Sequence, residues 1–166
     1  MEFKISKEFI AQIEQLISEN KEQELHNLLL DVHFADIAEI MDELDSHEAS
    51  YIFNTLDSEK TAEILLELDD DVREKILKSL SPKEIAEELD ELSTNDAADI
   101  IGELSHEIKQ QVISELEDVE HAKDIVDLLC YDEDSAGGSM AKELVKVNEN
   151  WNVLTCVKEM RLQAEN

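Results

Sequence analysis

The sequence has little positive charge. It contains 14 Lys and Arg residues against 43 Asp and Glu residues, so its formal net charge is −29. A surface this negative repels the phosphates of nucleic acids and of anionic lipids. The composition therefore argues against direct nucleic-acid binding and against docking on an anionic membrane. It is compatible with binding of divalent cations, which carboxylate oxygens ligate, and also with simple solubility or with a salt-adapted or crowded host.

Long hydrophobic runs are also missing. No apolar stretch approaches the roughly 20 residues that cross a bilayer, and no signal peptide opens the chain. We therefore expect no direct membrane insertion by this segment, which could still be a piece of a larger protein. Cys130 and Cys156 are far apart and form no metal-type pair, so reduced thiols in a cytosolic compartment are expected.

Catalytic signatures are absent from the sequence. There is no Walker loop, no GxSxG, no Rossmann fingerprint and no HExxH, and the five histidines have no cysteine partner. Carboxylate pairs are frequent, but a chain this acidic produces them by chance. The sequence therefore predicts a protein that is not an enzyme.

A leucine recurs every twelve residues through the middle of the chain. The series is Leu44, Leu56, Leu68, Leu80, Leu92, Leu104 and Leu116. Four residues before each leucine stand Ile40, Ile52, Ile64, Ile76, Glu88, Ile100 and Val112. Apolar residues at this spacing form one stripe on a helix, and a fixed period over this length indicates a repeat architecture.

The residue after each of the first six leucines is suited to begin the next helix. These residues are Asp45, Asp57, Asp69, Ser81, Ser93 and Ser105. Asp and Ser accept hydrogen bonds from the free N–H groups of a helical first turn, and Pro82 and Glu84 after Ser81 complete a capping-box pattern. The prediction is an all-α, right-handed superhelix of short helices with a period of about twelve residues. Leu28, Leu29 and Val32 extend the register backwards, and Ile125, Val126 and Leu129 extend it forwards with one inserted residue.

A small residue followed by an acid recurs in several of these helices. It suggests stacked helical hairpins of about 24 residues and places acids at equivalent positions, namely Glu39, Glu63, Glu87 and Asp99. From the residues alone, a solvated surface column is the simplest interpretation.

The chain changes character after Leu129. Residues 131–140 carry two of the three glycines and are interpreted as a loop that leaves the stack. Residues 144–147 alternate like a short strand, and residues 151–162 have a helical pattern. We therefore expect a helical domain over 1–130, a glycine-containing linker over 131–141, and a short β-α fragment over 142–166 that is incomplete by itself.

The linker Tyr131-Asp132-Glu133-Asp134-Ser135-Ala136-Gly137-Gly138-Ser139-Met140 is similar to the YxEDSAGGxM segment of MgtE-type magnesium transporters. In that family a superhelical N domain precedes a pair of CBS domains and a transmembrane pore. The resemblance covers nearly the whole chain, with residues 142–166 as the beginning of the first CBS domain. It implies a magnesium sensor at the cytoplasmic face of the cell membrane, in which low-affinity Mg²⁺ bound between acidic interfaces closes the pore. The implied partners are the CBS and pore domains of the same protein, as a homodimer.

The resemblance also implies metal ligands in this chain. Glu63 and Asp99 match family acids, Asn95 stands where the family has an aspartate, and Asp96 beside it is a substitute. The backbone carbonyl of Gly138 is a further candidate. Glu63 and Asp99 both belong to the acidic positions found from the period.

A second function stays open at this point. The superhelix also resembles that of flagellar motor switch proteins, so a protein-interaction module or adaptor without a metal role is the alternative. The glycine linker and the CBS-like end favour the transporter. Sequence beyond residue 166 would separate the two, through a completed CBS pair followed by apolar spans.

Overall fold

The computed structural model describes residues 5–132, 135–142 and 144–163, and these ranges contain eleven helices and no strand. The helices are α1 Lys7–Ser18, α2 Glu22–Leu29, α3 Phe34–Glu43, α4 Ser46–Thr55, α5 Ser58–Glu67, α6 Asp70–Ser79, α7 Pro82–Leu89, α8 Thr94–Glu103, α9 His106–Glu115, α10 Val119–Leu128 and α11 Val153–Gln163. The predicted all-α fold is confirmed.

The twelve-residue period sets where the helices begin. Helices α2 to α9 begin at residues 22, 34, 46, 58, 70, 82, 94 and 106. The N-caps of α4 to α9 are the six predicted residues, and α10 begins at residue 119 because of the inserted residue. A helix of eight to ten residues is marginal alone in water, so each depends on its neighbours for stability.

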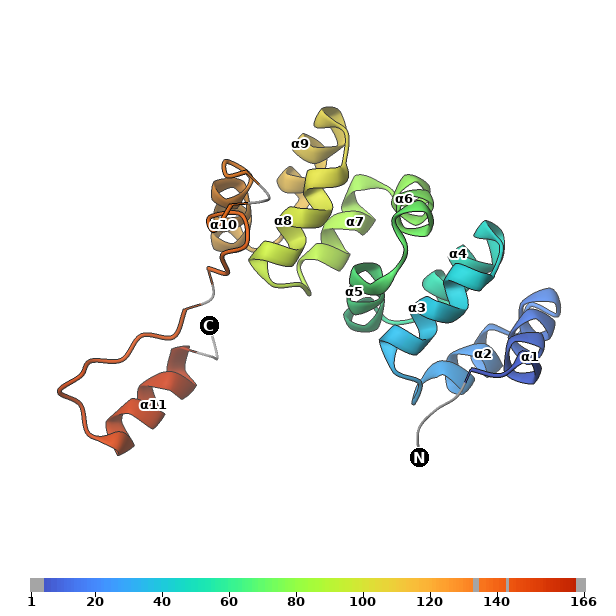
Figure 1. Cartoon of the computed structure of the whole chain (residues 1–166), viewed down its shortest axis with the longest axis horizontal. Helices are drawn as coiled ribbons and strands as arrows, with labels where there is room; N and C mark the ends of the chain where they lie inside the picture. The colour runs from blue at the N-terminus through green and yellow to red at the C-terminus, as the bar shows by residue number, and fades with distance from the viewer. Residues whose placement is uncertain (1–4, 133–134, 143, 164–166) are drawn as a thin grey trace.

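Helices pack mainly against the second helix along the chain. One series runs through α3, α5, α7 and α9; a second runs through α2, α4 and α6, and α8 packs on α10. Figure 1 shows α1 to α10 as one curved row, the shape expected of stacked hairpins. The predicted 24-residue unit is therefore the packing unit of the superhelix.

The core runs along this row. Every apolar member of the isoleucine column is buried, whereas Glu88, the exception in the column, is half-buried. The period leucines divide into two groups: Leu68, Leu92 and Leu116 are buried, and Leu44, Leu56, Leu80 and Leu104 are only half-buried against the core. The place in the twelve-residue period therefore does not by itself decide whether a leucine is buried.

The β part of the C-terminal fragment does not form a strand in the described residues. The backbone N–H and carbonyl of Lys146 instead bond the side-chain amide of Gln163, at 2.8 Å each. The backbone N–H and carbonyl groups of a strand need hydrogen-bond partners on a neighbouring strand. Here the side-chain amide of Gln163 is the partner of the Lys146 backbone. The helical part is confirmed as α11, which stands apart from the row in Figure 1 and buries none of its side chains.

Candidate functional site

The acids of the twelve-residue pattern all face solvent. Glu63 on α5 and Asp99 on α8 are exposed, and so are Glu39 and Glu87. Glu39, Glu63 and Glu87 lie on the consecutively packed helices α3, α5 and α7. Asp99 lies on α8, which packs on α10, so Asp99 is not part of the same stack. The expected column therefore has three members and not four.

A small cavity brings Asp99 and Gly138 together. The cavity has a volume of about 160 Å³ and lies between α8, α9, the end of α10 and the linker. Its lining residues are Ala98, Asp99, Gly102, Lys109, Leu128, Leu129, Tyr131 and Gly138. Two candidates taken from separate parts of the sequence thus line one cavity, whereas Glu63, Asn95 and Asp96 do not line it.

The linker reaches this cavity by folding back onto the helices. A Cβ atom on Gly137 would lie 2.5 Å from Cδ1 of Tyr131, so the close approach of the turn to this ring requires glycine. The Lys142 N–H donates to Oγ1 of Thr94 on α8 at 3.2 Å, and the Lys142 ammonium pairs with Asp127 on α10. The expectation that the loop leaves the stack was therefore wrong for the described residues, because Lys142 at the end of the linker still contacts α8 and α10.

Asn95 and Asp96 belong to a local network at the start of α8. The Ser93 hydroxyl lies 3.0 Å from Oδ1 of Asn95 and 2.5 Å from Oδ2 of Asp96. The Asn95 amide donates to Oδ1 of Asp96 at 2.9 Å. Both carboxylate oxygens of Asp96 therefore already accept hydrogen bonds, and both side chains are half-buried. A cation at these two residues would compete with the network for the same oxygens.

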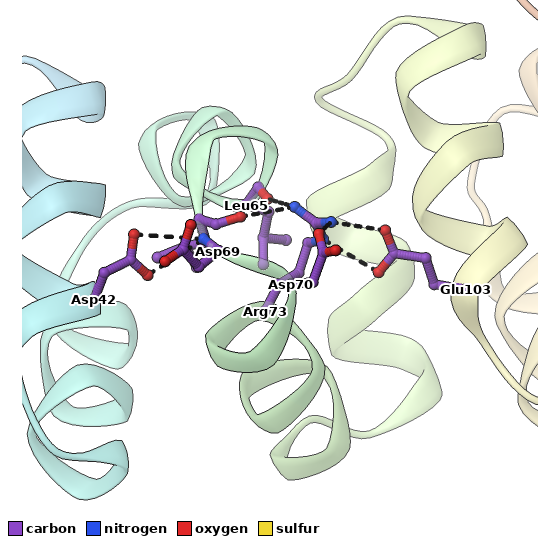
Figure 2. Close-up of polar contacts among 7 residues, drawn as sticks. Asp42, Leu65, Asp69, Asp70, Arg73 and Glu103 are labelled. Carbon is purple, nitrogen blue, oxygen red and sulfur yellow. Dashed lines mark hydrogen bonds and ion pairs between the residues drawn. The ribbon is translucent and has the colours of Figure 1, made fainter.

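Arg73 on α6 links the helices that carry Glu63 and Asp99 (Figure 2). Its Nη1 donates to the Leu68 carbonyl oxygen at 2.9 Å, at the C-terminal end of α5. Its Nη2 and Nε donate to Glu103 on α8 at 2.8 and 3.1 Å. Hydrogen bonding to Glu103 raises the pKa of Arg73, so the guanidinium stays charged. Sequence reasoning missed this link; its one signal was the basic character of the helix that contains Arg73.

A second link lies on the other side of the same junction in Figure 2. The carboxylate of Asp42 on α3 accepts a hydrogen bond from the Asp69 N–H, at 3.3 and 3.4 Å for its two oxygens. Burial raises the pKa of Asp42, although the bond from Asp69 favours the charged form. The junction between α5 and α6 is thus tied to α3 on one side and to α8 on the other.

The described ranges hold neither a preformed metal cluster nor a membrane-spanning helix. No group of three or more His, Cys, Asp or Glu side chains is arranged to hold a metal ion there. Among the same residues, no helix has the length and apolar character of a membrane span.

The fold and the site define a class: an acidic superhelix of short helices with a cavity lined by Asp99 and Gly138 near its C-terminal end. Residues 32–134 match the family described as the MgtE intracellular N domain. This match spans more than half of the sequence, and the chain belongs to that family. Members of this class are regulatory and not enzymes, in agreement with the lack of catalytic motifs. The family assignment also separates the chain from the flagellar motor switch proteins.

Two solved structures resemble the chain over most of its length. The cytosolic domain of the Mg²⁺ channel MgtE in complex with ATP has a TM-score of 0.82 at 28% identity, covering 94% of this chain and 64% of that one. The soluble part of a magnesium transporter has a TM-score of 0.77 at 24% identity, covering 96% and 62%. At that lower identity the second shows the fold alone. The chain spans less than two thirds of either structure, and none of the curated proteins compared matches it.

Proposed function

We propose that this chain is the magnesium-sensing regulatory part of a magnesium transporter or channel, on the cytoplasmic face of the cell membrane. The observation that carries the proposal is the cavity that Asp99 and Gly138 line together. Family membership and the cytosolic part of a Mg²⁺ channel among similar structures support it.

The donor groups at the cavity suit magnesium chemically. A carboxylate and a backbone carbonyl are both hard oxygen ligands, and Mg²⁺ keeps several of its waters, so one or two protein oxygens per domain suffice. Lys109 also lines the cavity, but its ammonium donates to the Gly102 carbonyl at 2.7 Å, where it compensates the C-terminal end of α8. Asp99 and the Gly138 carbonyl would supply the ligands on this side of a site, and a second domain would supply the others.

Glu63 would serve a separate site. It is exposed on α5 and away from the cavity, so its partner would also be a surface of another domain. Asn95 and Asp96 are weaker candidates, because both carboxylate oxygens of Asp96 already accept hydrogen bonds, from Ser93 and from the Asn95 amide. The partners proposed are the CBS and pore domains of the same protein, in a homodimer.

The high negative charge explains how magnesium could act on such an assembly. A charge of −29 stores electrostatic repulsion between acidic surfaces, and a divalent cation between them relieves it. If the closed arrangement binds Mg²⁺ more tightly than the open one, rising Mg²⁺ shifts the population toward closed. Falling Mg²⁺ would let the acids repel and the superhelix swing away from its partner.

A magnesium titration of this chain tests the proposal. We expect weak, millimolar binding, because each site would have only one of its two sides. In nuclear magnetic resonance spectra, the amide signals of Asp99 and Gly138 should shift and saturate, and Ca²⁺ should act similarly. Asp99→Asn should reduce these shifts, whereas Glu39→Gln, which removes the same charge from an exposed position, should not.

Sodium chloride at equal ionic strength is the control for screening. Sodium chloride should produce no saturating shifts of the Asp99 and Gly138 amide signals. The proposed site is refuted if sodium chloride reproduces them, or if Asp99→Asn leaves them unchanged.

A further inference from the structure

A carboxyl group interrupts the isoleucine column at the contact between α5 and α7. Glu88 on α7 holds the position that Ile64 and Ile76 hold on the two preceding helices, and its side chain is half-buried. One of its carboxyl oxygens, Oε2, lies 2.5 Å from Oγ1 of Thr61 on α5, and Thr61 is 1% exposed. The carboxyl group therefore sits in a packed contact, where a charged group is costly to bury.

The Thr61 hydroxyl has one proton and three acceptors within reach. Besides Glu88, its Oγ1 lies 3.2 Å from the carbonyl oxygens of both Asp57 and Ser58. When Glu88 is protonated, its O–H donates to Thr61, and Thr61 donates to a carbonyl of its own helix. When Glu88 releases that proton to water, Thr61 must turn its hydroxyl toward the carboxylate. Only the protonated arrangement makes both bonds without placing a charge in the contact.

Acids on α7 and in the turn that follows it favour the protonated form. Glu87 and Glu91 both repel a carboxylate at Glu88. Burial is the largest influence, and it raises the pKa of Glu88 from 4.5 to about 7 against the lowering effect of the bond from Thr61.

The two helices packed against α7, namely α5 and α9, bring little positive charge to stabilise a carboxylate at Glu88. On α5 the acids Glu59, Glu63 and Glu67 are exposed, and Lys60 donates to the Leu29 and Leu30 carbonyls at 2.8 Å each, at the end of α2. On α9 the charged groups are His106, Glu107, Lys109 and Glu115; all but Lys109 are exposed, and Lys109 is bonded to α8.

We propose that Glu88 and Thr61 form a proton-sensitive joint between α5 and α7, which is tight when Glu88 is protonated and weakened when Glu88 ionises. The joint is independent of magnesium. Because folding raises the pKa of this acid, its stabilising contribution is complete below the unfolded-state value of 4.5 and is lost as the pH rises through about 7.

Carboxyl carbon resonances of the whole chain test the titration directly. The Glu88 signal should titrate with a midpoint of about 7. A Glu88 midpoint near 4.5 would overturn the joint. This measurement uses the unmodified protein, so it does not depend on the folding of a variant.

Thermal unfolding tests whether the proton acts on stability. Between pH 6 and pH 8, the melting temperature of the unmodified chain should fall more than that of Glu88→Gln, whose side chain has the same shape and no charge. Glu39→Gln is the matched control and should keep the slope of the unmodified chain. Equal slopes for all three proteins would show that the proton does not control the contact, and would overturn the joint even if Glu88 titrates near 7.

Discussion

Single side chains on α5 divide by face: most of the apolar ones are buried and the acids are exposed. On α5, Ile64 and Leu65 are fully buried, and Leu68 at the helix end is 3% exposed. Glu63 and Glu67, on the opposite face of the same helix, are exposed. The stripe of apolar residues therefore supplies the free energy of packing, and the acids between them are available to solvent and ions.

Leu68→Ala tests the register at this scale. The substitution leaves a cavity in the core, so the free energy of unfolding should fall by about 2–5 kcal/mol in urea denaturation. Glu67→Ala, its exposed neighbour, should change stability by less than about 0.5 kcal/mol. A near-zero cost at Leu68 would show that the register is misassigned.

The sequence predicted the buried stripe but not the exceptions to it. Leu44 and Leu80 have the same place in the pattern as Leu68, yet they are half-buried, because the pattern does not say which layer edge another helix covers. Arg73 and Glu103 lie 30 residues apart, and nothing in the period indicates that their side chains meet. Contacts of this kind depend on how the stack curves.

The helices differ from one another mainly in how their ends are capped. Ser81 accepts a hydrogen bond from the Glu84 N–H at 3.3 Å, and the Glu84 carboxylate accepts one from the Ser81 N–H at 2.7 Å. Asp45 and Glu48 form a second capping box at α4. Ser105 holds the same position before α9, but its side chain makes no capping bond.

This contrast gives a matched pair of substitutions. Ser81→Ala removes the cap of α7 and should lower the free energy of unfolding by about 0.5–2 kcal/mol. Ser105→Ala removes the same hydroxyl where it caps nothing, and should cost less than about 0.5 kcal/mol. Chemical denaturation of both variants measures the difference. Equal losses would show that the capping box does not explain where α7 begins.

Helix boundaries were predictable from sequence because capping chemistry and the leucine period indicate the same residues. The strand predicted at residues 144–147 does not form, because alternation reports only local preference and a strand also needs a partner. The cavity at Asp99 was predictable only in part. The family resemblance pointed to Asp99 and Gly138 separately, but their meeting depends on the turn in which Gly137 packs against Tyr131.

Helices α1 to α10 form a curved and strongly acidic row, and the candidate ligands lie on α5, on α8 and in the linker. Arg73 joins α5 to α8, and the linker contacts at Lys142 hold the glycine turn against α8. These links tie the helices that carry Glu63 and Asp99 to one another and to the linker. α11 lies outside the row and keeps Val153 and Leu154 more than three quarters exposed.

The most direct test of magnesium sensing uses a full-length protein that contains this segment. Glu63 and Asp99 are replaced together by Ala, and magnesium flux is measured against internal Mg²⁺ concentration. Because the closed arrangement would lose ligands, we expect the pore to need more Mg²⁺ to close and cells to accumulate the ion. Glu39 and Glu87 replaced together are the control with equal charge loss, and should leave gating unchanged. Equal shifts for both pairs, or no shift for either, would contradict magnesium sensing by Glu63 and Asp99.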